Sequence, residues 1–175
     1  DRVDNPAHAS ILNNAPIQVY KQDEAERIDL LRRDEIEDYV YRLNRHPGRR
    51  VDIAVSAAQQ PGGIALDLLV NENKPWMAYF QLSNTGTKET SDWRERFGFV
   101  HNQLTNRDDI LSIDFVTAGF DSTSNALILS YDTPIYEQWL RFKPYFSWNE
   151  FTASDVGQAG EQFSGSGWKV GGELV

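Results

Sequence analysis

The segment Leu140–Asn149, with sequence LRFKPYFSWN, alternates apolar and polar side chains with a period of two. Successive side chains of a β-strand point to opposite faces of the sheet. This segment therefore predicts a strand with one apolar, aromatic-rich face and one polar, charged face. Such a strand suits either a soluble sandwich or a barrel that spans a membrane, and the turns and strand ends distinguish the two.

Five further segments repeat this alternation, so residues 76–175 are predicted to be entirely β-structure. Their apolar sets are Trp76, Ala78, Phe80 and Leu82; Trp93, Phe97 and Phe99; Leu111, Ile113 and Phe115; Leu127, Leu129 and Tyr131; and Trp168, Val170, Gly172 and Leu174. Glu95 and His101 interrupt the second set. The expected connections are 84–91, 105–108, 121–125, 133–138 and 149–167, and the last is predicted to be a long loop that includes Gly165-Ser166-Gly167.

Residues 1–75 predict a separate α+β domain, in which residues 1–27 carry no clear signal. Asp34 is expected to cap a helix over 35–44, because Asp is favoured at that position and apolar residues then recur on one face. A turn at 61–63 separates two alternating strands. The apolar positions of the helix and the strands are Ile36, Tyr39, Val40 and Leu43; Val51, Ile53 and Val55; and Leu66, Leu68 and Val70.

Composition excludes several classes of protein. A net charge of −9 over 175 residues argues against a nucleic-acid binder. Cysteine is absent, so there is neither a disulfide framework nor a thiolate metal site. The mean hydropathy of −0.54 is compatible with membrane strands, because alternation hides their apolar faces. Asp1 is expected to mark a mature start or a fragment boundary.

No catalytic constellation is evident, so the chain is not expected to be an enzyme and no cofactor is implied. The three histidines are scattered without metal-ligand spacing, and neither a nucleophile elbow nor a phosphate-binding loop occurs. The pairs Arg49-Arg50 and Asp108-Asp109 have the composition of solvated turns.

Three motifs carry a resemblance to a known family. The run Leu43-Asn44-Arg45-His46-Pro47, followed by Pro61-Gly62-Gly63, resembles the end of a POTRA domain. So does Leu66–Val70 leading into Lys74-Pro75-Trp76. The segment Leu82–Thr87, followed by Thr90–Arg94, resembles a first barrel hairpin. Together they resemble the outer-membrane transporters of two-partner secretion, the hemolysin secretion/activation (ShlB/FhaC/HecB, TpsB) family, from about Leu30 to Val175.

The resemblance implies a periplasmic POTRA domain over residues 1–75 and the first six strands of a transmembrane β-barrel over residues 76–175. In that family a barrel of about sixteen antiparallel strands follows two POTRA domains and exports a partner exoprotein without ATP. The chain is accordingly expected to be a fragment of a bacterial outer-membrane protein. It lacks the family's Val-Arg-Gly-Phe/Tyr motif, and neither a first POTRA domain nor an N-terminal plug helix is evident.

Alternation then assigns side chains to the two sides of the expected barrel. The residues predicted to face the lumen are Arg94, Arg96, Asp114, Arg141, Lys143, Lys169 and Glu173. The residues predicted to face lipid are Phe80, Phe97, Phe99, Phe115, Phe142 and Phe146. Trp76 and Trp139 are expected near the periplasmic rim, and Trp93, Trp148 and Trp168 near the outer rim.

Several alternatives stay open at this point. The lumenal cations are either solvated side chains balanced by Asp114 and Glu173 or a polar track that contacts the exported chain. The strand 51–57 or the strand 66–70 offers an edge to an extended client, unless another element covers it. In place of an export pore, the chain could belong to an outer-membrane assembly factor of the same superfamily. A soluble β-sandwich that binds a partner is the alternative from another class.

Overall fold

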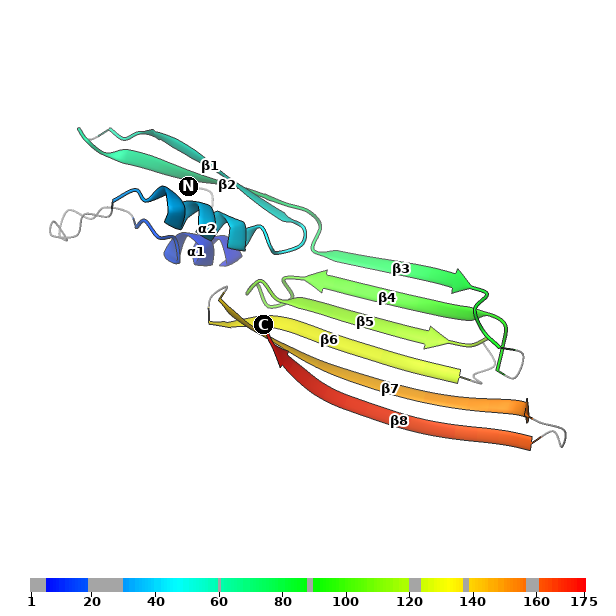
Figure 1. Cartoon of the computed structure of the whole chain (residues 1–175). Helices are drawn as coiled ribbons and strands as arrows, with labels where there is room; N and C mark the ends of the chain where they lie inside the picture. Colours follow the sequence, from blue (N-terminus) through cyan, green and yellow to red (C-terminus); the bar gives the residue numbers. More distant parts are fainter. Residues whose placement is uncertain are drawn as a thin grey trace. The chain divides into compact units, whose positions relative to one another are not determined.

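The computed structural model describes residues 6–18, 30–59, 61–87, 90–119, 124–136, 139–156 and 161–175. The chain divides into two compact units. The first comprises residues 1–75 together with 106–108, and the second comprises residues 76–105 and 109–175. Figure 1 shows helices and a β-hairpin in the first unit and a single layer of strands in the second.

The first unit contains α1 (Pro6–Asn13), α2 (Arg33–Leu43), β1 (Arg49–Ala57) and β2 (Ile64–Glu72). The predicted helix and the two predicted strands are present, whereas α1 lies in the region that carried no clear signal. β1 and β2 pair antiparallel from Arg49 opposite Glu72 to Ala57 opposite Ile64. The turn at 61–63 uses the positive φ of Gly62, +80°, which a residue without Cβ adopts without strain.

The core of this unit lies between the helices and the hairpin. Ile11 of α1, Leu43 of α2 and Val51 of β1 form a buried cluster. Partly buried apolar residues pack against it: Tyr39, Val40, Leu68 and Val70. The Tyr39 hydroxyl also donates a hydrogen bond of 2.6 Å to the carbonyl of Ile11. The predicted apolar face of α2 therefore does point into the core, and α1 completes it.

The start of α2 differs from the expectation. Arg32 occupies the N-cap position and makes no side-chain capping bond, while Asp34 lies inside the first turn with Glu35. The prediction that Asp34 caps the helix was wrong. Its carboxylate has a different effect, because negative charge in the first turn is stabilised by the helix dipole.

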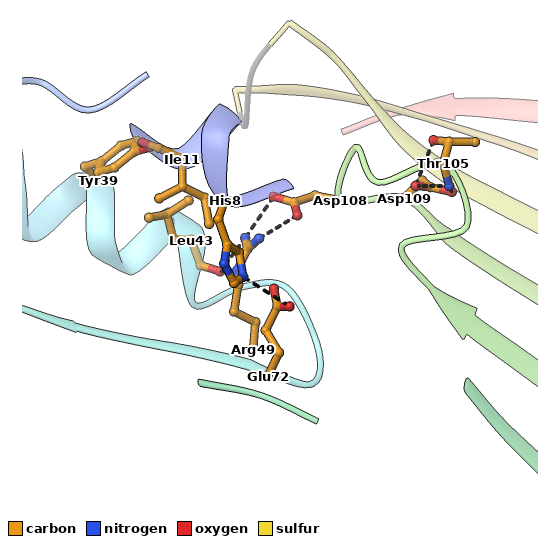
Figure 2. Close-up of polar contacts among 9 residues, drawn as sticks. All are labelled: His8, Ile11, Tyr39, Leu43, Arg49, Glu72, Thr105, Asp108 and Asp109. Atoms are coloured by element: carbon orange, nitrogen blue, oxygen red, sulfur yellow. Dashed lines mark hydrogen bonds and ion pairs between the residues drawn. The ribbon is translucent and has the colours of Figure 1, made fainter. Parts of the chain in front are cut away.

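Arg49 and Asp108 are not solvated, contrary to the turn compositions. The Arg49 side chain is 1% exposed and pairs through both terminal nitrogens with the Asp108 carboxylate, at 2.8 Å from Nη2 to Oδ2. Its Nη2 also donates to the Leu43 carbonyl at 3.0 Å. Figure 2 shows this arrangement, with His8 beside Glu72 at 3.2 Å. The pairing joins residues 59 apart in sequence, so local composition could not reveal it.

Asp109 is buried as well, for a local reason. It is 0% exposed, and its carboxylate accepts hydrogen bonds from the backbone N–H and the hydroxyl of Thr105. The bond from the Thr105 hydroxyl is 2.9 Å long. The segment remains a turn, but its carboxylate is satisfied by the protein instead of by water.

The second unit is one antiparallel sheet of six strands in chain order. The strands are β3 (Trp76–Ser83), β4 (Arg94–Asn102), β5 (Ile110–Thr117), β6 (Ser124–Tyr136), β7 (Leu140–Val156) and β8 (Glu161–Leu174). All six predicted strands are present, and each pairs with its neighbour in sequence. This is the hairpin array that the alternation indicates.

The last two connections are much shorter than predicted. β6 runs on to Tyr136, β7 to Val156, and β8 begins at Glu161. Most of the expected loop 149–167 is therefore strand, including Gly165-Ser166-Gly167, which pairs with β7. Phe151 lies opposite Gly165, and its ring occupies the space that a Cβ would fill. Trp148 and Trp168 consequently lie opposite each other within β7 and β8, not near the strand ends as expected.

Among the residues that the structure describes, no helix is both long and apolar enough to cross a membrane.

Candidate functional site: the polar face of the six-stranded sheet

The register of the sheet places side chains in rows that cross all six strands. Residues directly opposite one another on adjacent strands point to the same face. Two such rows are almost wholly apolar. One contains Ala78, Phe99, Ile113, Leu129, Phe146 and Val170, and the other contains Phe80, Phe97, Phe115, Leu127, Trp148 and Trp168.

The apolar rows end abruptly at one side. The next row contains Leu82, Glu95, Thr117, Asn125, Glu150 and Ser166. Glu95 is buried, and its carboxylate accepts a 3.0 Å hydrogen bond from the backbone N–H of Gly119. The interruption that Glu95 makes in the alternation thus belongs to a largely polar row that crosses the sheet and bounds the apolar band on this side.

Aromatic and aliphatic side chains within this band are widely exposed. Phe80 is 56% exposed, Val170 65% and Trp168 71%. A monomeric soluble protein rarely exposes a contiguous apolar surface of this kind. No second layer covers the band, because the strands that the structure describes in this unit form one sheet.

The opposite face carries polar and charged side chains, and a hydrogen-bonded cluster lies on β3, β4 and β5. Tyr79, Gly98 and Asp114 stand directly opposite one another on these three strands. The Tyr79 hydroxyl donates a 2.5 Å hydrogen bond to Asp114 Oδ1, and Arg96 Nε donates to the same oxygen at 2.8 Å. The Arg96 guanidinium also lies 5.8 Å from the centre of the Tyr79 ring.

Gly98 makes this cluster possible. A Cβ at position 98 would lie only 2.0 Å from Cζ of Tyr79, because the tyrosine ring lies flat across the Gly98 backbone. Only by crossing Gly98 does Tyr79 reach the strand beyond it and bond Asp114. One side chain thereby ties three strands together.

The other half of the polar face differs in how its charges are paired. Arg141 Nε donates to Asp132 Oδ1 at 2.8 Å. Lys143 stands directly opposite Glu173 in the register. Lys169 lies with its ammonium 5.3 Å from the centre of the Tyr145 ring. The cations of this face are therefore held in different ways.

All predicted site residues fall into two sets by face. The register places Arg94, Arg96, Asp114, Arg141, Lys143, Lys169 and Glu173 on the polar face. It places Phe80, Phe97, Phe99, Phe115, Phe142 and Phe146 on the apolar face. Contacts bring together Arg96 with Asp114, while Arg94 donates to the Ser91 carbonyl and the Thr90 hydroxyl.

Sequence reasoning missed the two tyrosines that organise this face. Tyr79 and Tyr145 occupy polar positions of their strands, but a tyrosine in an alternating segment does not reveal what it covers. The available signal was glycine in mid-strand at Gly98 and Gly171, since such a glycine often marks a close approach. Among the residues that the structure describes, no group of His, Cys, Asp and Glu is arranged to hold a metal ion.

Comparisons with known proteins find one curated transporter protein of similar sequence and one solved structure of similar fold. No family model matches the chain. The heme/hemopexin transporter protein HuxB of Haemophilus influenzae strain 86-028NP is 28% identical over 100 residues, which are 57% of this chain and 18% of HuxB. HuxB of H. influenzae strain Rd is 26% identical over the same shares of the two chains. The chain thus spans less than a fifth of the length of these curated relatives.

Among solved structures, CdiB from Escherichia coli matches with a TM-score of 0.70 at 16% sequence identity. The match covers 98% of this chain and 30% of the CdiB chain. At this identity the likeness concerns the fold alone, and it includes both units. The chain therefore has the fold of about a third of CdiB and a sequence similar to part of a heme/hemopexin transporter.

Proposed function

We propose that this chain is part of an outer-membrane pore that exports a partner polypeptide, in the manner of two-partner secretion. The single observation that carries the proposal is the division of the six-stranded sheet into an apolar band and a charged face. A strand exposed to lipid on one side and to water on the other has this division. The similarity to HuxB and the fold shared with CdiB support it.

In this proposal the apolar band contacts outer-membrane lipid, and the polar face lines a hydrated lumen. An unfolded polypeptide carries many unpaired backbone groups, which cost several kcal/mol each in hydrocarbon. A polar lumen avoids that cost. The first unit is then the periplasmic POTRA-like domain, placed before the first barrel strand.

We further assign the first unit to binding of the unfolded client. β1 and β2 form a two-stranded sheet, and among the described residues neither strand has a partner on its outer edge. An extended client can add a strand to such an edge through main-chain hydrogen bonds, without requiring a particular sequence. Because ordering a flexible client opposes binding, the affinity should be modest.

The test is made on the full-length protein that contains this chain. Reconstituted in planar bilayers, it should conduct ions. Deletion of the residues up to about Lys74 should abolish export of the partner while the barrel stays inserted. Export that survives the deletion would exclude the client-binding role, and a protein that inserts without conducting would exclude the pore.

Two alternatives remain to be weighed in the same experiment. An assembly factor of the same superfamily would, when deleted, impair the insertion of many unrelated barrels and not the export of one partner. A soluble β-sandwich requires a second sheet over the apolar band, and the described strands of the second unit form only one sheet. A protein that is soluble without detergent would identify the sandwich.

A further inference from the structure

Pro144 interrupts the pairing of two strands in the interior of the sheet. β7 pairs with β6 on one side and with β8 on the other, and a proline in such a strand removes a ladder hydrogen bond because it has no N–H. The pairing of β7 with β8 continues through Pro144. The pairing with β6 does not, because it joins Ser130 to Tyr145 and next Thr133 to Phe142, and passes over the two positions between them.

The direction of the backbone explains why only one side is interrupted. The backbone N–H and C=O of Arg141 both bond to Val175, directly after β8, at 2.8 and 2.9 Å. Successive residues of an antiparallel strand direct their backbone groups to opposite neighbours. Pro144 lies three positions after Arg141, so its backbone faces β6. The missing N–H is therefore lost from the β6–β7 ladder, where the register places Tyr131 opposite Pro144.

The end of β6 beyond this point has a strand neighbour on one side only. β5 begins at Ile110, which lies opposite Asp132. Among the described residues, the part of β6 after Asp132 accordingly pairs with β7 alone. A second irregularity falls there, because the register with β7 shifts between Pro134 and Tyr136. This end of β6 is thus held by a short ladder that is interrupted twice.

One ion pair joins the two strands between these interruptions. Arg141 Nε on β7 donates to Asp132 Oδ1 on β6 at 2.8 Å. The Arg141 side chain is 13% exposed and the Asp132 side chain 27%, so solvent screens this pair less than it screens a surface pair. A charge-assisted hydrogen bond therefore holds the strands together where the backbone bonds are fewest.

We propose that the hairpin end, residues 131–136 of β6 with 140–144 of β7, is a conformational device that opens locally. In the open state the end of β6 separates from β7, while β7 stays paired with β8. Pro144 lowers the cost of the separation, and the Asp132–Arg141 pair is the lock that closes it. Folded proteins open locally in segments that few interactions hold. Because Asp132 and Arg141 lie on the polar face, opening rearranges the charges of that face.

The experiment measures amide hydrogen exchange, resolved by residue, of the full-length protein in lipid vesicles. The amides of Tyr131 and Thr133 face β7, as do those of Leu127 and Leu129 further along the same strand. In wild type the first two should exchange faster than the last two. Pro144→Val supplies the missing N–H and should slow exchange at Tyr131 and Thr133 by about fivefold, the effect of one added backbone hydrogen bond.

Asp132→Asn tests the lock, because it keeps the size of the side chain and removes its charge. Exchange at Thr133 should rise by about tenfold, as expected when a hydrogen bond between charged groups is weakened. Glu173→Gln is the matched control, since it removes a carboxylate from the same face on β8, where the ladder opposite Lys143 is continuous. It should leave exchange at Thr133 unchanged.

Each part of the proposal has an outcome that overturns it. Exchange at Thr133 that is equal in Asp132→Asn and wild type overturns the lock. Wild-type exchange that is as slow at Thr133 as at Leu129 overturns the local opening. An acceleration in Asp132→Asn that extends equally to Leu127 and Leu129 means that the whole sheet is destabilised, and it overturns the local opening as well.

Discussion

Gly98→Ala tests whether one tyrosine holds three strands together. The added Cβ would lie 2.0 Å from Cζ and 2.3 Å from Cε1 of Tyr79, a separation that real Cβ atoms do not show. The tyrosine ring must therefore leave its place over position 98. When it leaves, its hydroxyl loses Asp114, which is buried.

The expected change in the free energy of unfolding combines one stabilising effect with two destabilising effects. Replacing glycine by alanine in a strand interior stabilises by about 0.5–1 kcal/mol through backbone entropy. Loss of a hydrogen bond to a charged group costs about 1.5–3 kcal/mol, and the forced repacking of an overfilled site costs about 1–3 kcal/mol. The repacking partly overlaps with the lost hydrogen bond. We therefore expect Gly98→Ala to reduce the free energy of unfolding by about 1–3 kcal/mol.

The assay is reversible urea unfolding of the full-length protein in lipid vesicles, with Gly167→Ala as the matched control. Gly167 is also in mid-strand on the polar face, but its added Cβ would lie 3.4 Å from the Oδ1 atom at the flexible end of Asn149. That variant should be neutral or slightly stabilised. In a Tyr79→Ala background Gly98→Ala should lose most of its cost, because the clash is gone. Equal stability of the two glycine variants would refute the three-strand role of Tyr79.

Three other substitutions address the remaining parts of the structure. Phe146→Lys, in an apolar row of β7, should reduce the free energy of unfolding in vesicles by about 2–4 kcal/mol. Ser147→Lys, on the opposite face, should reduce it far less. Equal losses would mean that this strand is not in a bilayer. Tyr39→Ala should destabilise the first unit by about 3–5 kcal/mol, read from amide hydrogen exchange of β1, and unchanged protection would show that the core was misassigned. Arg49→Gln leaves the Asp108 carboxylate buried without its cation and should cost about 3–5 kcal/mol by the same readout. The double variant Arg49→Gln, Asp108→Asn should recover stability. An Arg49→Gln variant as stable as wild type would show that the pair does not stabilise the first unit.

The strands of the second unit could be predicted because their signal is local. Each side chain's face depends only on its position along its own strand, so alternation around Phe97, Phe115 and Phe146 suffices to assign both faces. The ends of β7 and β8 could not be predicted in this way. Gly165-Ser166-Gly167 has the composition of a loop, and its strand conformation comes with pairing to β7, where the ring of Phe151 lies over Gly165.

The elements that sequence reasoning missed depend on distant partners. α1 is 8 residues long, too short to be stable alone, and it is held by Ile11 in the core and by the bond from Tyr39. The organisation of the polar face depends on register across three strands. Sequence reasoning identified Arg96 and Asp114 as residues of one face, but only the pairing of β3, β4 and β5 brings them together beneath Tyr79.

The strictly sequential pairing of the six strands has a consequence for how the sheet is made. Within the described part of the chain, the strands from β3 to β8 pair with their nearest neighbours in sequence, so each of these pairs closes a short loop. The entropy lost at each closure is small, and contacts of low sequence separation form quickly. The sheet can therefore form one hairpin after another, with each strand pairing with the strand that precedes it in sequence.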